Sequence, residues 1–224
     1  IEKALVFMKA KKPVLIDKPV VGSAADCDRL LNLQEKHGSL IYGGSSLRYA
    51  REVTALREAI GPRQDLLSIV AAGPGDFFSY GIHTTEMLQG CVGTGVQSVR
   101  AITQHKVPVL AVTYHDGFVA LLHLQMPFHE WSLCAHTGQG LRTTTVSVDG
   151  LYEPFLQNFI TLLKGGRVDY TLAGPVEAVR VHLAAKLSLE KGTEISLDSL
   201  PGDVGFDGQV FAEEYAAAKR RQQP

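Results

Sequence analysis

The first part of the chain alternates between helical and strand-like hydrophobic patterns. Ile1–Ala10 has apolar residues at helical spacing, and Val14–Ile16 is a short apolar run that predicts a buried strand. Cys27–His37 is again helical and follows Ser23–Asp26, which resembles a capping box. Ser39–Tyr42 predicts the next strand. This order of helix, strand, helix and strand is typical of the last part of a parallel α/β sheet.

The rest of the chain is richer in strands. The predicted strands are Asp65–Ala72, Val96–Thr103, Val109–His115, Phe118–Gln125, Trp131–His136 and Arg142–Val148. The predicted helices are Arg51–Ile60, Phe77–Gln89, Asp149–Leu163 and Pro175–Leu189. Asp116-Gly117 is typical of a two-residue hairpin turn. The fold class is therefore α/β (α+β), with a parallel segment followed by a largely antiparallel open sheet that has helices on one face.

The sheet face without helices should be apolar. It would carry side chains such as Val109, Val112, Leu121 and Leu124, or their alternates. Exposed apolar area of this size usually marks an oligomer interface. We therefore expect the chain to associate with further copies of itself through this face.

Composition and charge exclude several classes of protein. The chain has 224 residues, 45% hydrophobic and 20% charged, and a formal net charge of -1, so we expect no nucleic-acid partner. We also expect no membrane partner, because no apolar run approaches the roughly 18 residues of a membrane span. The three cysteines, Cys27, Cys91 and Cys134, are widely spaced, which indicates reduced, mostly buried thiols of a cytoplasmic protein. The eight histidines have no metal-binding spacing, so no metal site is predicted.

A lysine follows the first predicted strand and is the first candidate for chemistry. Asp17, Lys18 and Pro19 come directly after Val14–Ile16. Open α/β sheets bind ligands at the carboxyl ends of their strands. Lysine is also a side chain whose pKa responds strongly to burial, which suits proton transfer. The alternative is an ordinary strand exit whose Lys18 is solvated.

A histidine on a later helix is the second candidate. His83 follows the turn Gly73-Pro74-Gly75, and Ser79, His83 and Met87 share one face of the predicted helix. A histidine there can be a satisfied core residue, or it can point into a cleft and transfer a proton. The residues alone leave both interpretations open.

Together these two segments resemble the Gfo/Idh/MocA oxidoreductases. That family closes its nucleotide-binding domain with helix, strand, an acid-Lys-Pro triplet, helix and strand, as Ile1–Tyr42 does. Gly73–Glu86 resembles the family's glycine-rich turn and histidine-bearing helix. The resemblance covers roughly Ile1 to Gly192, and two motifs in the right order make it fairly specific.

The resemblance implies roles for these residues. Lys18 would lie beside the nicotinamide of NAD or NADP and act as acid or base, and His83 would bind the substrate hydroxyl and pass its proton. In the family, the proline of the triplet often follows a cis peptide bond, which implies one before Pro19. The residues expected to bind the cofactor are Asp17, Lys18, Pro19 and Arg48. Those expected to bind a small-molecule substrate are Tyr49, Asp76, Ser79, Tyr80 and His83.

The sequence departs from the family pattern at one important place. The family commonly has an aspartate four residues before the histidine, whereas this chain has Ser79. A serine cannot carry the negative charge that would tune His83 or Lys18. Asp76 lies about one turn out of register and could compensate, and Tyr80 could donate a hydrogen bond.

Arg48 and Tyr49 occupy the join between the two parts of the chain. They lie where relatives carry an Arg-Arg-Phe-like segment, and would line the cofactor or substrate cleft. The alternative is that Arg48 pairs with a surface acid.

The resemblance also implies how the chain is organised. We expect the end of a Rossmann domain over residues 1–40, a substrate and oligomerisation domain over 41–197 and a polar tail, partly ordered at best, over 198–224. The chain begins at Ile1 in mid-pattern and contains no Gly-x-Gly-x-x-Gly turn, so we expect this segment to lack most of the dinucleotide-binding half and to be inactive alone. A homodimer or homotetramer through the sheet face would follow the family.

Two hypotheses of function remain. The first is an NAD(P)-dependent oxidoreductase that moves a hydride between nicotinamide and a sugar-like hydroxyl or ketone. The second is a non-catalytic binding or assembly protein on the same fold, which Ser79 in place of the acid would favour.

Overall fold

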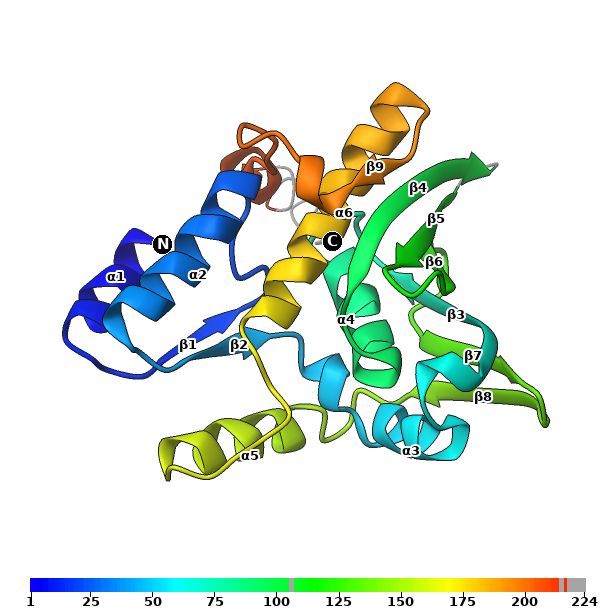
Figure 1. The fold of residues 1–224 in the computed structure, drawn as a ribbon, viewed down its shortest axis with the longest axis horizontal. Coiled ribbons are helices and arrows are strands. Elements are labelled where there is room, and N and C mark those ends of the chain that lie inside the picture. Colours follow the sequence, from blue (N-terminus) through cyan, green and yellow to red (C-terminus); the bar gives the residue numbers. More distant parts are fainter. Residues whose placement is uncertain (105–106, 214–215, 217–224) are drawn as a thin grey trace, which may run out of the picture.

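The computed structural model describes residues 1–104, 107–213 and 216 (Figure 1). Its α-helices are α1 (Glu2–Lys9), α2 (Ala24–His37), α3 (Arg51–Ile60), α4 (Gly81–Val92), α5 (Tyr152–Leu163) and α6 (Ala173–Lys191). Its strands are β1 (Val14–Asp17), β2 (Ile41–Gly44), β3 (Leu66–Pro74), β4 (Val96–Gln104), β5 (Val107–Tyr114), β6 (Val119–Met126), β7 (Trp131–Thr137), β8 (Gly140–Val146) and β9 (Ile195–Ser196). Short 3-10 helices cover Ser46–Tyr49, Arg63–Asp65 and Leu197–Ser199. Among the described residues, no helix is long and apolar enough to cross a membrane.

The N-terminal part is a small parallel α/β unit. β1 and β2 pair in parallel, with Val14 opposite Ile41 and Asp17 opposite Gly44. α2 has the predicted start, because the Ser23 side chain accepts a hydrogen bond from the Asp26 N–H. Figure 1 shows α1 and α2 beside this sheet at one end of the molecule.

The prediction that Val14–Ile16 is buried is wrong. Burial alternates along β1, and Leu15 is 38% exposed. The reason is that β1 pairs only with β2 among the described strands, so the strand lies at the edge of a two-stranded sheet. Its apolar residues therefore lack the neighbours that a central strand would have.

The larger sheet has seven strands in the order β8-β7-β3-β6-β5-β4-β9. β3 and β6 pair in parallel, and the other neighbours are antiparallel. The predicted hairpin between β5 and β6 is confirmed, but its turn has three residues, His115–Gly117, in place of the two expected, because the Tyr114 N–H donates to the Phe118 carbonyl at 2.8 Å and the Gly117 N–H to the Tyr114 carbonyl at 2.9 Å. A short parallel α/β unit followed by a mostly antiparallel sheet with helices is the predicted fold class, and it is confirmed.

One face of this sheet is covered by α4 and α6 and carries the core (Figure 1). Val112 and Leu124 are buried there, which contradicts their assignment to the open face. Val109 and Leu121 are half-buried on the opposite face, as predicted. Side chains alternate along a strand, so residues three apart cannot share a face. The open face therefore has a smaller apolar set than predicted.

The start of the predicted tail is ordered and packs on the rest of the chain. The Val204 carbonyl accepts from the Ala24 N–H at 2.9 Å, and the Phe206 N–H donates to the Gly22 carbonyl at 2.7 Å. The Phe206 ring stacks on Phe78 with centroids 4.2 Å apart. This segment thus covers the start of α2 and contacts the turn before α4. Residues 214–215 and 217–224 of the predicted tail lie outside the described residues.

Candidate active site

The carboxyl end of β1 places Lys18 against the turn before α4. The Asp17 carboxylate accepts from the Lys18 N–H at 2.8 Å, and the Lys18–Pro19 peptide bond is cis, as predicted. Lys18 Nζ donates to the Ser79 carbonyl at 2.9 Å and contacts Ser79 Oγ at 3.0 Å. Lys18 is therefore held in place by neutral acceptors and is not a freely solvated strand exit.

The turn that carries Ser79 is fixed by Asp76. The Asp76 carboxylate accepts from the Phe78 N–H at 3.0 Å and from the Ser79 N–H at 2.6 Å. Gly75 has a positive φ of 85°, and a Cβ at this position would lie 2.3 Å from the Tyr80 ring. Asp76 and Gly75 thus set the turn geometry, and Asp76 occupies a capping position.

The helix that carries His83 begins later than predicted. The helix was expected from Phe77, but Phe77–Tyr80 form turns and α4 begins at Gly81. The cause is the Gly81 N–H, which donates to the Asp76 carbonyl at 3.0 Å in a wider turn than that of an α-helix. His83 accordingly lies in the first turn of α4.

Tyr80 and His83 complete one side of the site. The Lys18 ammonium lies 5.0 Å from the centre of the Tyr80 ring, a cation–π distance. Tyr80 packs edge-to-face on His83 with centroids 5.8 Å apart, and Trp131 lies 5.9 Å from His83. The structure therefore brings Lys18 together with Ser79, Tyr80 and His83, although 61 positions of chain separate Lys18 from Ser79.

Ser45 is a neighbour of His83 that the sequence interpretation missed. Ser45 Oγ lies 2.6 Å from His83 Nδ1, and it also accepts from the Leu47 N–H at 3.1 Å. With Leu47 as donor, the Ser45 hydroxyl proton can point to Nδ1, which leaves the imidazole proton on Nε2. The only sequence signal was the Gly43–Ser46 run at the domain join.

Burial sets the protonation states of His83 and Lys18. Burial, together with the smaller effect of the nearby Lys18 ammonium, lowers the pKa of His83 to about 3. Burial also lowers the pKa of Lys18, against the opposing effect of the Asp17, Asp76 and Glu86 carboxylates. His83 is thus neutral near pH 7 and can donate or accept a hydrogen bond, while Lys18 is moved toward the range useful for proton transfer.

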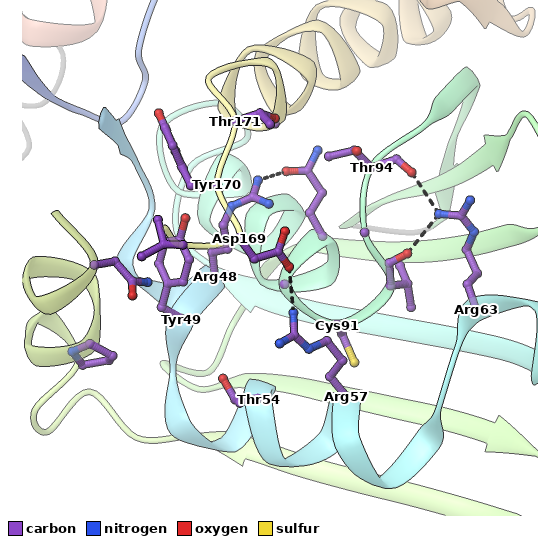
Figure 2. Close-up of a pocket in the computed structure, with 18 of the residues that line it drawn as sticks. Arg48, Tyr49, Thr54, Arg57, Arg63, Cys91, Thr94, Asp169, Tyr170 and Thr171 are labelled. Atoms are coloured by element: carbon purple, nitrogen blue, oxygen red, sulfur yellow. Dashed lines mark hydrogen bonds and ion pairs between the residues drawn. The ribbon is translucent and has the colours of Figure 1, made fainter. Parts of the chain in front are cut away.

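Arg48 and Tyr49 do not join this group. The Arg48 Nε donates to the buried Glu86 carboxylate at 3.2 Å, and its Nη2 donates to Gln89. The alternative that Arg48 forms an ion pair is therefore the one observed. Its partner, however, is the buried Glu86 and not a surface acid. Burial raises the pKa of Tyr49 to about 12. Both residues line a separate cavity to which Lys18 and His83 do not contribute (Figure 2).

A second buried histidine supports the turn. His182 of α6 is fully buried, and its Nε2 lies 2.8 Å from Thr85 Oγ1. The Phe77 ring packs edge-to-face on it with centroids 5.5 Å apart. Burial lowers the pKa of His182 to about 4. His182 therefore packs, as a neutral ring, against the segment that positions Ser79 and His83.

These two histidines should make the protein sensitive to acid. Their pKa values in the unfolded chain are near 6.5, whereas burial lowers them to about 3 in His83 and about 4 in His182. Below pH 6.5 the unfolded chain binds the protons first, so stability falls with falling pH. Near pH 5 we expect a loss of about 2 kcal/mol for each histidine. The free energy of unfolding, measured by urea denaturation at pH 7 and near pH 5, gives this loss.

The His182→Gln variant separates the two contributions. Glutamine keeps a polar group near Thr85 but does not titrate, so the acid-induced loss should be about half that of the wild type. His37→Gln at the C-terminal end of α2, outside this segment, is the control. A wild-type unfolding free energy that stays constant from pH 7 to pH 5 would contradict this prediction.

No known protein-family profile and no curated protein sequence matches the chain. Solved structures do share its fold. GenD2 from gentamicin A biosynthesis, solved in complex with NAD, has a TM-score of 0.70 and 17% identity over 86% of this chain and 74% of that chain. Scyllo-inositol dehydrogenase from Lactobacillus casei, with bound NAD(H) and scyllo-inositol, has a TM-score of 0.74 and 13% identity over 88% and 77% of the two chains.

A third structure with the same fold is the WlbA dehydrogenase from Bordetella pertussis, in complex with NADH and UDP-GlcNAcA. Its TM-score is 0.70, with 16% identity over 87% of this chain and 74% of that chain. At these identities the similarity establishes a shared fold. The chain thus has the fold of these dehydrogenases.

Proposed function

We propose that the protein is an NAD(P)-dependent oxidoreductase that transfers a hydride between nicotinamide and a sugar-like hydroxyl or ketone. The observation that carries the proposal is the meeting of Lys18, Ser79, Tyr80 and His83 at the carboxyl end of a parallel strand. Carboxyl ends of such strands are where α/β folds bind ligands. The fold is shared with dehydrogenase structures that contain NAD or NADH.

The substrate class follows from the same neighbours and from the site. Two of these structures contain scyllo-inositol or UDP-GlcNAcA, which are hydroxyl-rich molecules. The site supplies an ammonium, an imidazole and a hydroxyl, which suit hydrogen bonds to neighbouring hydroxyl groups. A polyol or sugar derivative therefore fits better than an apolar substrate.

The residues present fit the nicotinamide end of the cofactor. Asp17, Lys18 and Pro19 lie at the strand end, and the Lys18 ammonium is held beside His83 and Tyr80. When bound, the cofactor accepts or supplies the hydride. The sequence contains no Gly-x-Gly-x-x-Gly turn for the pyrophosphate, and the Gly75 turn is already filled by Tyr80. We accordingly assign residues only to the nicotinamide end.

Lys18 would move the proton that accompanies hydride transfer. Its lowered pKa lets the neutral amine accept a hydroxyl proton in the oxidation direction, and lets the ammonium donate it in reduction. His83, with its proton on Nε2, would orient the hydroxyl or carbonyl oxygen. Ser79 positions Lys18 but, unlike the aspartate of the family, cannot act as a base that takes up the proton.

A substrate panel tests this function. The full-length protein is mixed with polyols, sugars and sugar derivatives in the presence of NAD or NADP, and the formation of reduced cofactor is recorded. Turnover of at least one hydroxyl compound supports the proposal. Tight cofactor binding without turnover of any compound would favour the alternative, a binding or assembly protein, which Ser79 in place of the family's aspartate supports.

We also propose that two copies associate through the open sheet face. The half-buried Val70, Leu121 and Ala111 lie opposite one another across β3, β6 and β5, and Val109 lies two positions along β5, opposite His123. Such a contiguous apolar area suits an interface that buries on the order of 1,000 Å² or more. The expected particle is a homodimer or homotetramer.

Sedimentation of a Leu121→Arg variant tests the interface. A buried, unpaired charge at its centre should convert the oligomer to a 24.3 kDa monomer. Leu163→Arg at the end of α5 is the matched control, because Leu163 is an exposed leucine on a helix and does not belong to the sheet. A monomeric wild type at tens of micromolar, or dissociation by the control alone, would contradict the proposal.

A further inference from the structure

A polar cavity lies apart from the candidate active site. It has a volume of about 710 Å³ and is bounded by α3, the end of α4 and the segment before α6 (Figure 2). This volume lies within the range of small-molecule sites, roughly 300–1,000 Å³. Its lining residues include none of Lys18, Ser79, Tyr80 and His83. The reaction proposed above therefore leaves this cavity unused.

The lining is rich in arginine. Four guanidinium groups and one carboxylate, that of Asp169, belong to the described lining residues. The arginines are Arg48, Arg57, Arg63 and Arg167. The four arginines differ in how many of their N–H groups already donate hydrogen bonds within the protein. The remaining N–H groups decide which arginine can bind a ligand.

Arg63 donates most of its hydrogen bonds within the protein. It pairs with Asp116 at 2.9 Å and donates to the carbonyls of Val92 and Thr94, both at 2.9 Å. Its guanidinium also lies 4.2 Å from the centre of the Tyr114 ring. Arg63 thus holds the end of α4 in place and has little left to offer a ligand.

Arg48 is also mostly used. Its Nε donates to Glu86 and its Nη2 donates to Gln89. Gly174 lies against the guanidinium, since a Cβ at position 174 would come within 3.2 Å of Nη2. Its charge is balanced by Glu86, which lies behind the cavity wall and does not line it. Arg48 therefore contributes mainly to the wall.

Arg57 and Arg167 remain available. Arg57 donates from Nη1 to the Asp169 carboxylate at 3.3 Å (Figure 2). This ion pair is open to solvent, with side chains 48% and 93% exposed. Arg167 is exposed and forms no hydrogen bond or ion pair with any described residue. Exposed pairs of this kind are weak, so a multivalent anion can replace Asp169.

We propose that this cavity binds a phosphorylated small molecule. Arg57 and Arg167 bind the phosphate, because the guanidinium fork matches phosphate oxygens, and Asp169 is displaced. The hydroxyls of Thr54 and Thr171 and the ring of Tyr49 line the remaining space for the organic part. This site is independent of the reaction proposed at Lys18.

Calorimetry with inorganic pyrophosphate at low ionic strength tests the site. Arg57→Gln and Arg167→Gln should each weaken binding about tenfold, since each removes charge-assisted hydrogen bonds. Asp169→Asn should strengthen binding, because it removes the competing carboxylate. Arg29→Gln, which loses the same charge on α2 outside the cavity, should bind as the wild type does.

A second ligand series tests the organic part. Glucose 6-phosphate should bind more tightly than inorganic phosphate, and glucose should not bind, because the cavity is larger than a phosphate ion. Equal affinity for the two phosphates would restrict the site to the inorganic ion and contradict the proposal. Absence of pyrophosphate binding, equal weakening by Arg29→Gln, or loss of binding in Lys18→Gln alone would overturn it as well.

Discussion

Replacing Lys18 by methionine is expected to lower kcat by about 10²–10⁴-fold, the usual contribution of a positioned acid or base. Methionine has a similar length but no proton to exchange, while Ser79 and Tyr80 remain to shape the site. The rate of cofactor reduction with the best substrate of the panel is the measurement. KM should change much less than kcat if Lys18 acts chiefly in the transition state.

The control for this variant is Lys186→Met. Lys186 also donates to a backbone carbonyl, that of Gly205 at 3.1 Å, but it lies outside the site. Its removal should leave kcat unchanged. A Lys18→Met enzyme with wild-type kcat would show that Lys18 only packs against the turn.

A pH profile separates proton transfer from positioning. Ser79→Asp places a carboxylate beside the Lys18 ammonium, which stabilises the charged form and raises the pKa of Lys18. The limb of the oxidation profile that requires the neutral amine should therefore move to higher pH. A structural role for Lys18 would leave this limb in place.

Local signals in the sequence were sufficient for most elements. The start of α2 followed from Ser23, and the β5–β6 hairpin followed from Asp116-Gly117, because each signal acts within a few residues. The end of α3 at Ile60 followed in the same way from Gly61. Such features depend on backbone conformation and capping, which the local sequence determines.

Predictions that depended on distant neighbours were less accurate. Val14–Ile16 has the composition of a buried strand, yet its exposure is set by how many strands flank it. Val112 and Leu124 were placed on the wrong face because hydrophobicity alone does not fix strand register. The start of α4 was placed four residues too early, since the Gly81 N–H donates to the Asp76 carbonyl in a turn wider than that of an α-helix.

In the candidate site, too, motifs could be predicted from the sequence but contacts between distant residues could not. Lys18 and His83 were paired through the resemblance of two motifs, and the structure places them close enough for Lys18 to lower the pKa of His83. Ser45 carried no chemical signal in the sequence, because its role depends on a contact across 38 positions of chain. The partner of Arg48 could not be predicted either, because Glu86 has the sequence pattern of an ordinary polar residue on a helix.

That partner leads to the largest expected effect on stability. Arg48 is 11% exposed and Glu86 is 1% exposed, so their ion pair is almost fully removed from water. Arg48→Met leaves the Glu86 carboxylate buried without its counterion. We expect a loss of roughly 3–5 kcal/mol in the free energy of unfolding, measured by urea denaturation at pH 7.

The cost should come from the orphaned charge and not from the missing arginine. Adding Glu86→Leu to Arg48→Met removes that charge, so most of the lost stability should return. Arg51→Met is the matched control, because Arg51 pairs with Glu153 at the surface with side chains 75% and 70% exposed, and an exposed pair contributes about 0–1 kcal/mol. If the double variant is as unstable as Arg48→Met, the arginine stabilises the protein through contacts other than Glu86. Gln89, whose amide links Arg48 to Glu177 of α6, would then be the group to examine.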